Sequence, residues 1–155
     1  MAQYQDALRT LTYNNASVSP NVTNRVVNIV VNDGALDSPT AVSTVAITSV
    51  NDAPSFTKGL DQTVNEDSGA QSVANWATSI SDGDGGTQIL GFNITGNSNP
   101  GLFAAGPSVS STGTLTYTPA ANQNGTATLT LTLSDNGGTA NGGVDTSAAQ
   151  TFVIN

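Results

Sequence analysis

Three short segments carry the residues whose types and spacing could bind an ion. Residues 82–86 read DGDGG, residues 135–138 read DNGG, and Asn51 and Asp52 stand shortly before a proline. None of these segments contains Lys or Arg, so carboxylates that meet there require a cation to compensate their charge. Calcium takes about six to eight oxygens from carboxylates, amides and backbone carbonyls, and glycine lets carbonyls turn inward. The pattern predicts a Ca²⁺ site formed by Asn51, Asp52, Asp82, Asp84 and Asp135.

The same residues also have a simpler interpretation. Asp-Gly and Asn-Gly are ordinary turn pairs, so any one of these Asp residues taken alone is an exposed turn residue. A metal is favoured by the expected meeting of three segments, without a countercharge, at one end of the fold. Glu66, Asp67 and Asp145 are weaker metal candidates. Glu66 and Asp67 end the first strand at the opposite end, where they either bind an ion shared with a following unit or close a turn.

The composition excludes several functional classes. The 155 residues contain no His and no Cys, which removes zinc fingers, thiol nucleophiles, disulfides and Ser-His-Asp triads. We therefore expect no enzyme. Three Lys and Arg residues against eleven Asp and Glu residues give a formal net charge of -8, so neither nucleic acid nor a membrane surface is an expected partner. No apolar run reaches about 18 residues, so no membrane-spanning helix is expected.

The polar residues indicate an all-β protein. Only 9% of the residues are charged, and Thr, Ser and Asn take the place of charged side chains. Thr suits an exposed pleated surface, while Asn, Gly and Ser suit turns. Alternating apolar residues bounded by Gly, Asn and Pro predict seven strands in the C-terminal two thirds of the chain. These strands cover residues 55–64, 70–80, 88–95, 103–110, 113–118, 126–134 and 148–154.

An internal repeat organises the chain. The sequence TLTY occurs at residues 10–13 and again at 114–117, and VAI at 45–47 aligns with FVI at 152–154. A further pair of alternating segments matches in between, so the repeat is about 100 residues long. The expected organisation is a closing half unit at residues 1–50, a proline-stiffened linker at 51–54 and a complete unit at 55–155. In the half unit, strands are expected at 8–13, 25–32 and 42–50, after a helical turn at 3–8.

Seven short strands with turns between them predict a two-sheet Greek-key β-sandwich. Successive strands of such a sandwich reverse direction, so alternate loops lie at the same end. Residues 82–86 and 135–138 then lie at the end where the linker enters, beside Asn51 and Asp52. This placement is the reason to expect one shared ion site.

Four of these features together resemble a known family. Residues 65–67 (NED), 82–84 (DGD), 135–137 (DNG) and an Asn-Asp-x-Pro linker at 51–54 follow the order found in cadherin domains. More closely, the sequence resembles the bacterial cadherin-like and Ig-like tandem repeats of large secreted, RTX-type surface adhesins. The resemblance implies an Ig-like or cadherin-like Greek-key β-sandwich, located outside the cell and rigidified by Ca²⁺ at the junctions between repeats.

The resemblance also implies which residues bind the ion. The strand-A glutamate of the family corresponds to Glu66, its paired aspartates to Asp82 and Asp84, and its linker ligands to Asn51 and Asp52. The sequence departs from cadherins at residues 48–50, which read TSV where the cadherin linker begins with a further Asp, and it lacks the Asp-Arg-Glu motif. One or two ions per junction are therefore expected rather than three.

The expected function is that of a non-catalytic, calcium-binding spacer in a bacterial extracellular adhesin or fibre, secreted and displayed at the cell surface. Its expected partners are neighbouring repeats of the same protein. Two alternatives stay open, an accessory module of a large secreted enzyme and a carbohydrate-binding module. Trp76, Tyr13 and Tyr117 could line a sugar platform, although a single Trp in a sandwich strand usually belongs to the core.

The half unit carries an apolar pattern that one three-stranded piece cannot cover. The alternating residues are Leu11, Val27, Ile29, Val31, Val45 and Ile47. We expect strands of another chain to complete residues 1–50 in trans, which gives self-association as a dimer or a head-to-tail fibre. The alternative is that this part is poorly ordered.

Overall fold

The computed structural model describes residues 2–17 and 19–155. The chain divides into two compact units, Met1–Ser49 and Val50–Asn155, and the division falls next to the Asn-Asp-Ala-Pro segment. None of the helices in the described part of the chain has the length and apolar character needed to cross a membrane.

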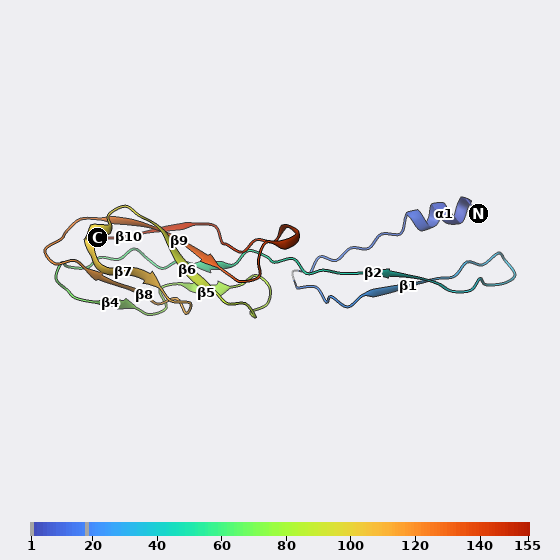
Figure 1. Ribbon diagram of the computed structural model, residues 1–155, viewed down its shortest axis with the longest axis horizontal. Coiled ribbons are helices and arrows are strands. Elements are labelled where there is room, and N and C mark those ends of the chain that lie inside the picture. The colour runs from blue at the N-terminus through green and yellow to red at the C-terminus, as the bar shows by residue number, and fades with distance from the viewer. Residues whose placement is uncertain (1, 18) are drawn as a thin grey trace. The chain divides into compact units, whose positions relative to one another are not determined.

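The Val50–Asn155 unit is a sandwich of short antiparallel strands (Figure 1). Its elements are β3 (Ser55–Thr57), β4 (Gln71–Val73), β5 (Thr78–Ser81), β6 (Gly91–Asn97), the 3₁₀ helix η1 (Pro100–Leu102), β7 (Phe103–Val109), β8 (Leu115–Pro119), β9 (Ala127–Ser134), the 3₁₀ helix η2 (Ala140–Gly142) and β10 (Gln150–Ile154). One layer is the sheet β10-β9-β6, which Gln62 extends by pairing in parallel with Ile154. The other layer contains the sheet β4-β8-β7 and the pair β3-β5. This arrangement confirms the predicted all-β, Ig-like sandwich.

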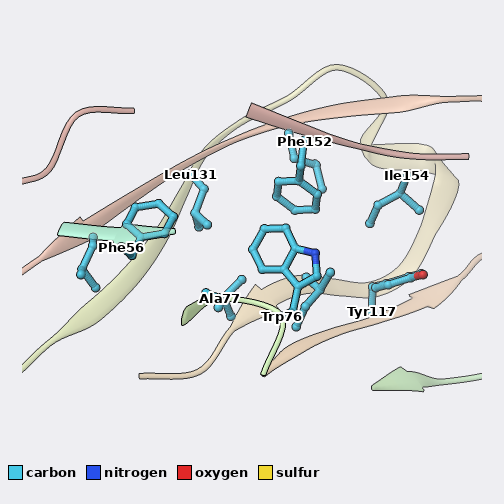
Figure 2. Packing of buried hydrophobic residues seen from close by; sticks show 11 residues of the cluster. Phe56, Trp76, Ala77, Tyr117, Leu131, Phe152 and Ile154 are labelled. Atoms are coloured by element: carbon cyan, nitrogen blue, oxygen red, sulfur yellow. The ribbon is translucent and has the colours of Figure 1, made fainter. Parts of the chain in front are cut away.

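The core lies between the two layers and depends on strict alternation along β9. Leu129, Leu131 and Leu133 of this strand are each 0% exposed, whereas the residues between them face outward or lie partly exposed. Figure 2 shows the Trp76 ring facing Phe152, and the two ring centroids are 4.5 Å apart. Trp76 is 4% exposed and donates its indole N–H to the Leu60 carbonyl at 2.9 Å. The expectation that Trp76 belongs to the core is confirmed, so this residue forms no sugar platform.

Three predicted strands of this unit differ in extent from the observed ones. The segment predicted as one strand over 70–80 breaks after β4 and resumes as β5 in a different strand pair, with Asn75 at a φ of 54° between them. The strand predicted to begin at residue 88 begins only at Gly91, because the backbone N–H groups of Gln88 and Ile89 donate to the Asp82 and Asn136 side chains. Of the strand predicted over 55–64, the structure forms β3 and the isolated bridge at Gln62.

The Met1–Ser49 unit contains the helix α1 (Ala2–Arg9) and a hairpin of β1 (Arg25–Ile29) with β2 (Ala41–Val45). The two strands pair antiparallel, with Val27 opposite Ser43. Among residues 5–17 and 19–49 no residue is buried. The hairpin confirms the central parts of the strands predicted at 25–32 and 42–50, and α1 includes the predicted helical turn at 3–8.

The strand predicted over residues 8–13 is wrong. Residues up to Arg9 belong to α1, and residues 11–17 form no regular element. At the end of the helix, Thr10 donates both its hydroxyl and its backbone N–H to the Ala7 carbonyl, at 2.7 and 3.2 Å. The same TLTY sequence is part of β8 in the other unit, where β4 and β7 pair with it on both sides. In the first unit, the described strands β1 and β2 pair with each other and not with residues 10–13, so local sequence alone does not make a strand here.

Candidate metal centre

Three segments of the Val50–Asn155 unit meet at the end where the chain enters it. They are residues 51–54, the loop between β5 and β6, and the loop between β9 and β10. The Asp52 backbone N–H donates to Asp84 Oδ2 at 3.1 Å, and Asn51 Nδ2 donates to Asp135 Oδ1 at 3.0 Å. The structure therefore brings together the segments that hold Asn51, Asp52, Asp82, Asp84 and Asp135.

Asp82 is the residue that shapes the β5–β6 loop. It is 1% exposed, and its two carboxylate oxygens accept backbone N–H groups of Asp84, Gly86, Thr87 and Gln88 at 2.8–3.1 Å. These hydrogen bonds, that from Gln88 first, lower the pKa of Asp82 against the opposing effect of burial. Because both of its oxygens are already engaged, Asp82 holds the loop in shape and offers no open oxygen to an ion.

Asp84 and Asp135 each keep one oxygen bonded and one open. Asp84 Oδ2 accepts the Asp52 N–H and Gln88 Nε2, while Asp84 Oδ1 is buried without a donor. Asp135 Oδ1 accepts Asn51 Nδ2 and the Gly137 N–H, while Asp135 Oδ2 is buried without a donor. The bonded oxygens fix both carboxylates to their surroundings, and the open oxygens are acceptors without a donor.

Gln88 is a member of the site that sequence reasoning missed. Its Nε2 donates to Asn51 Oδ1 at 2.7 Å and to Asp84 Oδ2 at 2.9 Å, and its Oε1 is buried without a donor. The one signal in the sequence is its position four residues after Asp84, as the first long polar side chain after the glycines. Because Gln88 is neither an acid nor an Asn, the ligand pattern predicted from the sequence does not include it.

The side chains that carry the open oxygens are connected by hydrogen bonds through the Asn51 and Gln88 amides. In the described part of the chain, the buried side-chain atoms without a hydrogen-bond partner are Asp84 Oδ1, Gln88 Oε1 and Asp135 Oδ2. Each belongs to a side chain whose other polar atom is bonded to the Asn51 or Gln88 amide. Buried acceptors without a donor in the protein are rare in folded proteins, and such atoms usually bind an ion or a water. Two carboxylate oxygens and an amide oxygen are hard ligands that suit Ca²⁺.

The acids by themselves do not make this site. Within residues 2–17 and 19–155, no three Asp, Glu, His or Cys side chains gather as a group that could hold a metal. Asp52 is exposed and joins the site through its backbone N–H. A metal here therefore depends on two carboxylates together with neutral oxygens.

The other predicted ligands lie elsewhere or make other hydrogen bonds. Asp145 accepts the Asp135 N–H with its backbone carbonyl, but its carboxylate accepts the Thr146 hydroxyl. Glu66 lies at the opposite end of the unit, where it lines a cavity of about 390 Å³ together with Ile154 and Asn155. Asp67 accepts the Asn122 N–H beside that end. The structure does not bring Glu66 or Asp67 to the three linker-end segments.

A comparison with known families identifies the fold type. The family described as "Bacterial Ig domain" matches residues 37–147, which is most of the chain. The chain belongs to the bacterial Ig domain family. Bacterial Ig domains are non-catalytic modules typical of surface and extracellular proteins. The matched region includes all three segments of the site. No match was found among curated proteins or among solved structures.

Proposed function

We propose that this bacterial Ig domain chain is a non-catalytic, calcium-binding tandem-repeat module of an extracellular adhesin or fibre of the RTX type. The observation that carries the proposal is the group of three buried, unpartnered oxygens on Asp84, Gln88 and Asp135. The chain has no His and no Cys, which removes the commonest general bases and nucleophiles from its repertoire. The family's occurrence in surface proteins supports a secreted, cell-surface location.

The ion would hold the linker to the body of the unit. Asp84 and Asp135 supply two negative charges from different loops, and neither loop contains Lys or Arg. Asn51 and Asp52 are hydrogen bonded to those same two carboxylates. A divalent cation between the carboxylates removes their repulsion and so stabilises the attachment of residues 51–54. A fixed linker lets neighbouring repeats, the proposed partners, extend away from the cell instead of folding back.

Calcium titration of the whole chain tests this function. Because Ca²⁺ binds the folded state, the melting temperature should rise with the logarithm of its concentration above the dissociation constant. Mg²⁺ should have a smaller effect, because its octahedral shell dehydrates reluctantly. Asp84→Asn and Asp135→Asn should each weaken Ca²⁺ binding roughly tenfold or more by calorimetry. Asp145→Asn, in the same loop as Asp135, is the matched control and should bind as the parent does.

The proposal fails if saturating Ca²⁺ changes neither the melting temperature nor the heat of titration. A loss of binding in Asp145→Asn that equals the loss in Asp135→Asn would also contradict it, because the effect would then follow general loop charge and not the open oxygen. Glycosidase, esterase or protease turnover that disappears on substitution of one acid would contradict the non-catalytic assignment.

A further inference from the structure

We infer that Gln88 is a direct ligand of the ion and that Asn51 is the residue that positions it. This inference rests on the proposed calcium function. It assigns a ligand that the acidic motifs do not contain, and it changes the role of Asn51 from ligand to positioning residue. Four hydrogen bonds determine the orientation of the two side-chain amides.

The orientation of the Asn51 amide is fixed by its acceptors. Asn51 Nδ2 donates to the Val144 carbonyl at 2.7 Å and to Asp135 Oδ1 at 3.0 Å. The Asn51 backbone carbonyl in turn accepts the Val144 N–H at 2.9 Å. A flipped side chain would place its oxygen against two acceptors, so the flip is unfavourable. Asn51 Oδ1 must therefore face Gln88.

The orientation of Gln88 follows from that of Asn51. Gln88 Nε2 uses its two hydrogens on Asn51 Oδ1 at 2.7 Å and on Asp84 Oδ2 at 2.9 Å. A flipped Gln88 would bring its oxygen against these two acceptors and would lose both bonds. Its Oε1 is consequently turned away from both acceptors, and it is buried without a donor. The Val144 carbonyl thus orients Asn51, and Asn51 orients Gln88.

The chemistry of the three open oxygens favours a cation over a single water. One water has two hydrogens, so it leaves at least one of Asp84 Oδ1, Gln88 Oε1 and Asp135 Oδ2 without a donor. A divalent cation bound by all three would satisfy each oxygen and balance the two carboxylate charges. The neutral Gln88 adds an oxygen without adding a further negative charge, which would destabilise the ion-free state.

Gly137 leaves room for the side-chain amides of Asn51 and Gln88, because it has no Cβ atom. A methyl group at this position would overlap Asn51 Oδ1 and would lie 2.7 Å from Gln88 Oε1. The glycine therefore lets the β9–β10 loop pass close to both side chains. This close approach is an independent sign that the loop is built around the Asn51–Gln88 pair.

Side-chain carbonyl NMR of the whole chain separates a ligand from a positioning residue. On addition of Ca²⁺, the Gln88 Cδ resonance should shift strongly, because its oxygen gains the ion, whereas the Asn51 Cγ resonance should shift little. Gln88→Leu should weaken Ca²⁺ binding roughly tenfold. Gln123→Leu, an exposed glutamine at the other end of the unit, is the matched control and should leave Ca²⁺ affinity unchanged.

A double-mutant cycle tests the positioning role. Asn51→Ala should weaken Ca²⁺ binding in the parent chain and should cost clearly less affinity in the Gln88→Leu background, because only the Asn51 bond to Asp135 is then left to lose. Additive losses would overturn the positioning role. An unshifted Gln88 Cδ in a chain that binds Ca²⁺ would overturn the ligand role and leave the proposed function standing. A chain that binds no Ca²⁺ would overturn both.

Discussion

The backbone N–H of Gln88 donates to Asp82 Oδ2 at 3.0 Å. This bond connects the fully buried acid of the β5–β6 loop to the residue whose side chain completes the open oxygen group. In this loop, Asp82 therefore fixes the backbone, whereas Asp84 and Gln88 carry the open side-chain oxygens. Substitution of Asp82 should therefore mainly change the stability of the fold, whereas substitution of Asp84 or Gln88 should mainly change ion affinity.

The first prediction concerns pH and Asp82. Its pKa in the folded chain is lowered by the backbone N–H bonds, from Gln88 first, whereas in the unfolded chain it has an ordinary value of about 3.9. A depressed folded pKa stabilises the chain above the unfolded pKa, and this stability is lost as the pH falls below about 4 toward the folded pKa. Urea unfolding between neutral and acid pH should show this loss.

Two variants check the assignment of that acid effect. Asp82→Asn should be less stable at neutral pH, because an amide presents an NH₂ group to backbone donors, and its stability should depend less on acid pH. Glu66→Gln, the same change from carboxylate to amide at the opposite end of the unit, is the control and should leave the stability at neutral pH close to that of the parent. An Asp82→Asn chain with the full acid dependence would refute the prediction.

The second prediction concerns Gly137. Gly137→Ala should cost about 1–3 kcal/mol of unfolding free energy and weaken Ca²⁺ binding, because the methyl group overlaps Asn51 Oδ1. Gly101→Ala is the matched control, because a methyl group there meets only Asn99 Oδ1 at an ordinary 3.9 Å. Chemical denaturation and calorimetry measure both effects. Equal stability of the two variants would show that the amide pair tolerates displacement.

The third prediction uses the core. Leu131 is 0% exposed on β9, so Leu131→Ala should lower the unfolding free energy by about 2–5 kcal/mol. Leu60 is 84% exposed, and Leu60→Ala should stay within about 0.5 kcal/mol of the parent. Trp76 is the single Trp and is buried, so its fluorescence reports the unfolding of the Val50–Asn155 unit directly. A small effect at Leu131 would mean that the two layers pack loosely.

The fold could be predicted from the sequence where alternation and burial agree. Along β9, each apolar residue of the pattern is buried, because two neighbouring strands and the opposite layer leave one register that covers the apolar face. The TLTY segment at residues 10–13 shows the limit of this reasoning. Its twin in β8 is a strand because β4 and β7 pair with it, and neighbouring strands are not a property of the segment itself.

The site could be predicted only in part. The meeting of the Asp-Gly loops with Asn51 follows from strand direction, which alternation reveals. The different roles of Asp82 and Asp84 do not follow from strand direction, because they depend on which carboxylate oxygens accept backbone N–H groups. Asp82 and Asp84 look equivalent in the sequence, yet Asp82 has both oxygens engaged and Asp84 has one open. Gln88 has no motif, and only the hydrogen-bond directions reveal its open oxygen.

The last prediction concerns the hairpin of the Met1–Ser49 unit, which we expect to be completed by another chain. A two-stranded hairpin is marginally stable in water, and no residue among 5–17 and 19–49 is buried. Val26 and Val42 are 61% and 64% exposed on neighbouring strands. Apolar surface of this kind, beside strand edges with open backbone groups, favours pairing with a second copy.

Light scattering over a range of concentrations tests this expectation. The whole chain should form assemblies larger than one chain, and deletion of residues 1–49 should abolish them while Trp76 fluorescence stays that of a folded core. Val42→Asp should weaken assembly, because the new charge would be buried in the contact. Leu60→Asp, at an exposed apolar residue of the other unit, should not. A monomer at all concentrations would refute completion in trans, and rapid amide exchange in β1 and β2 of that monomer would mean that the hairpin has no partner to stabilise it.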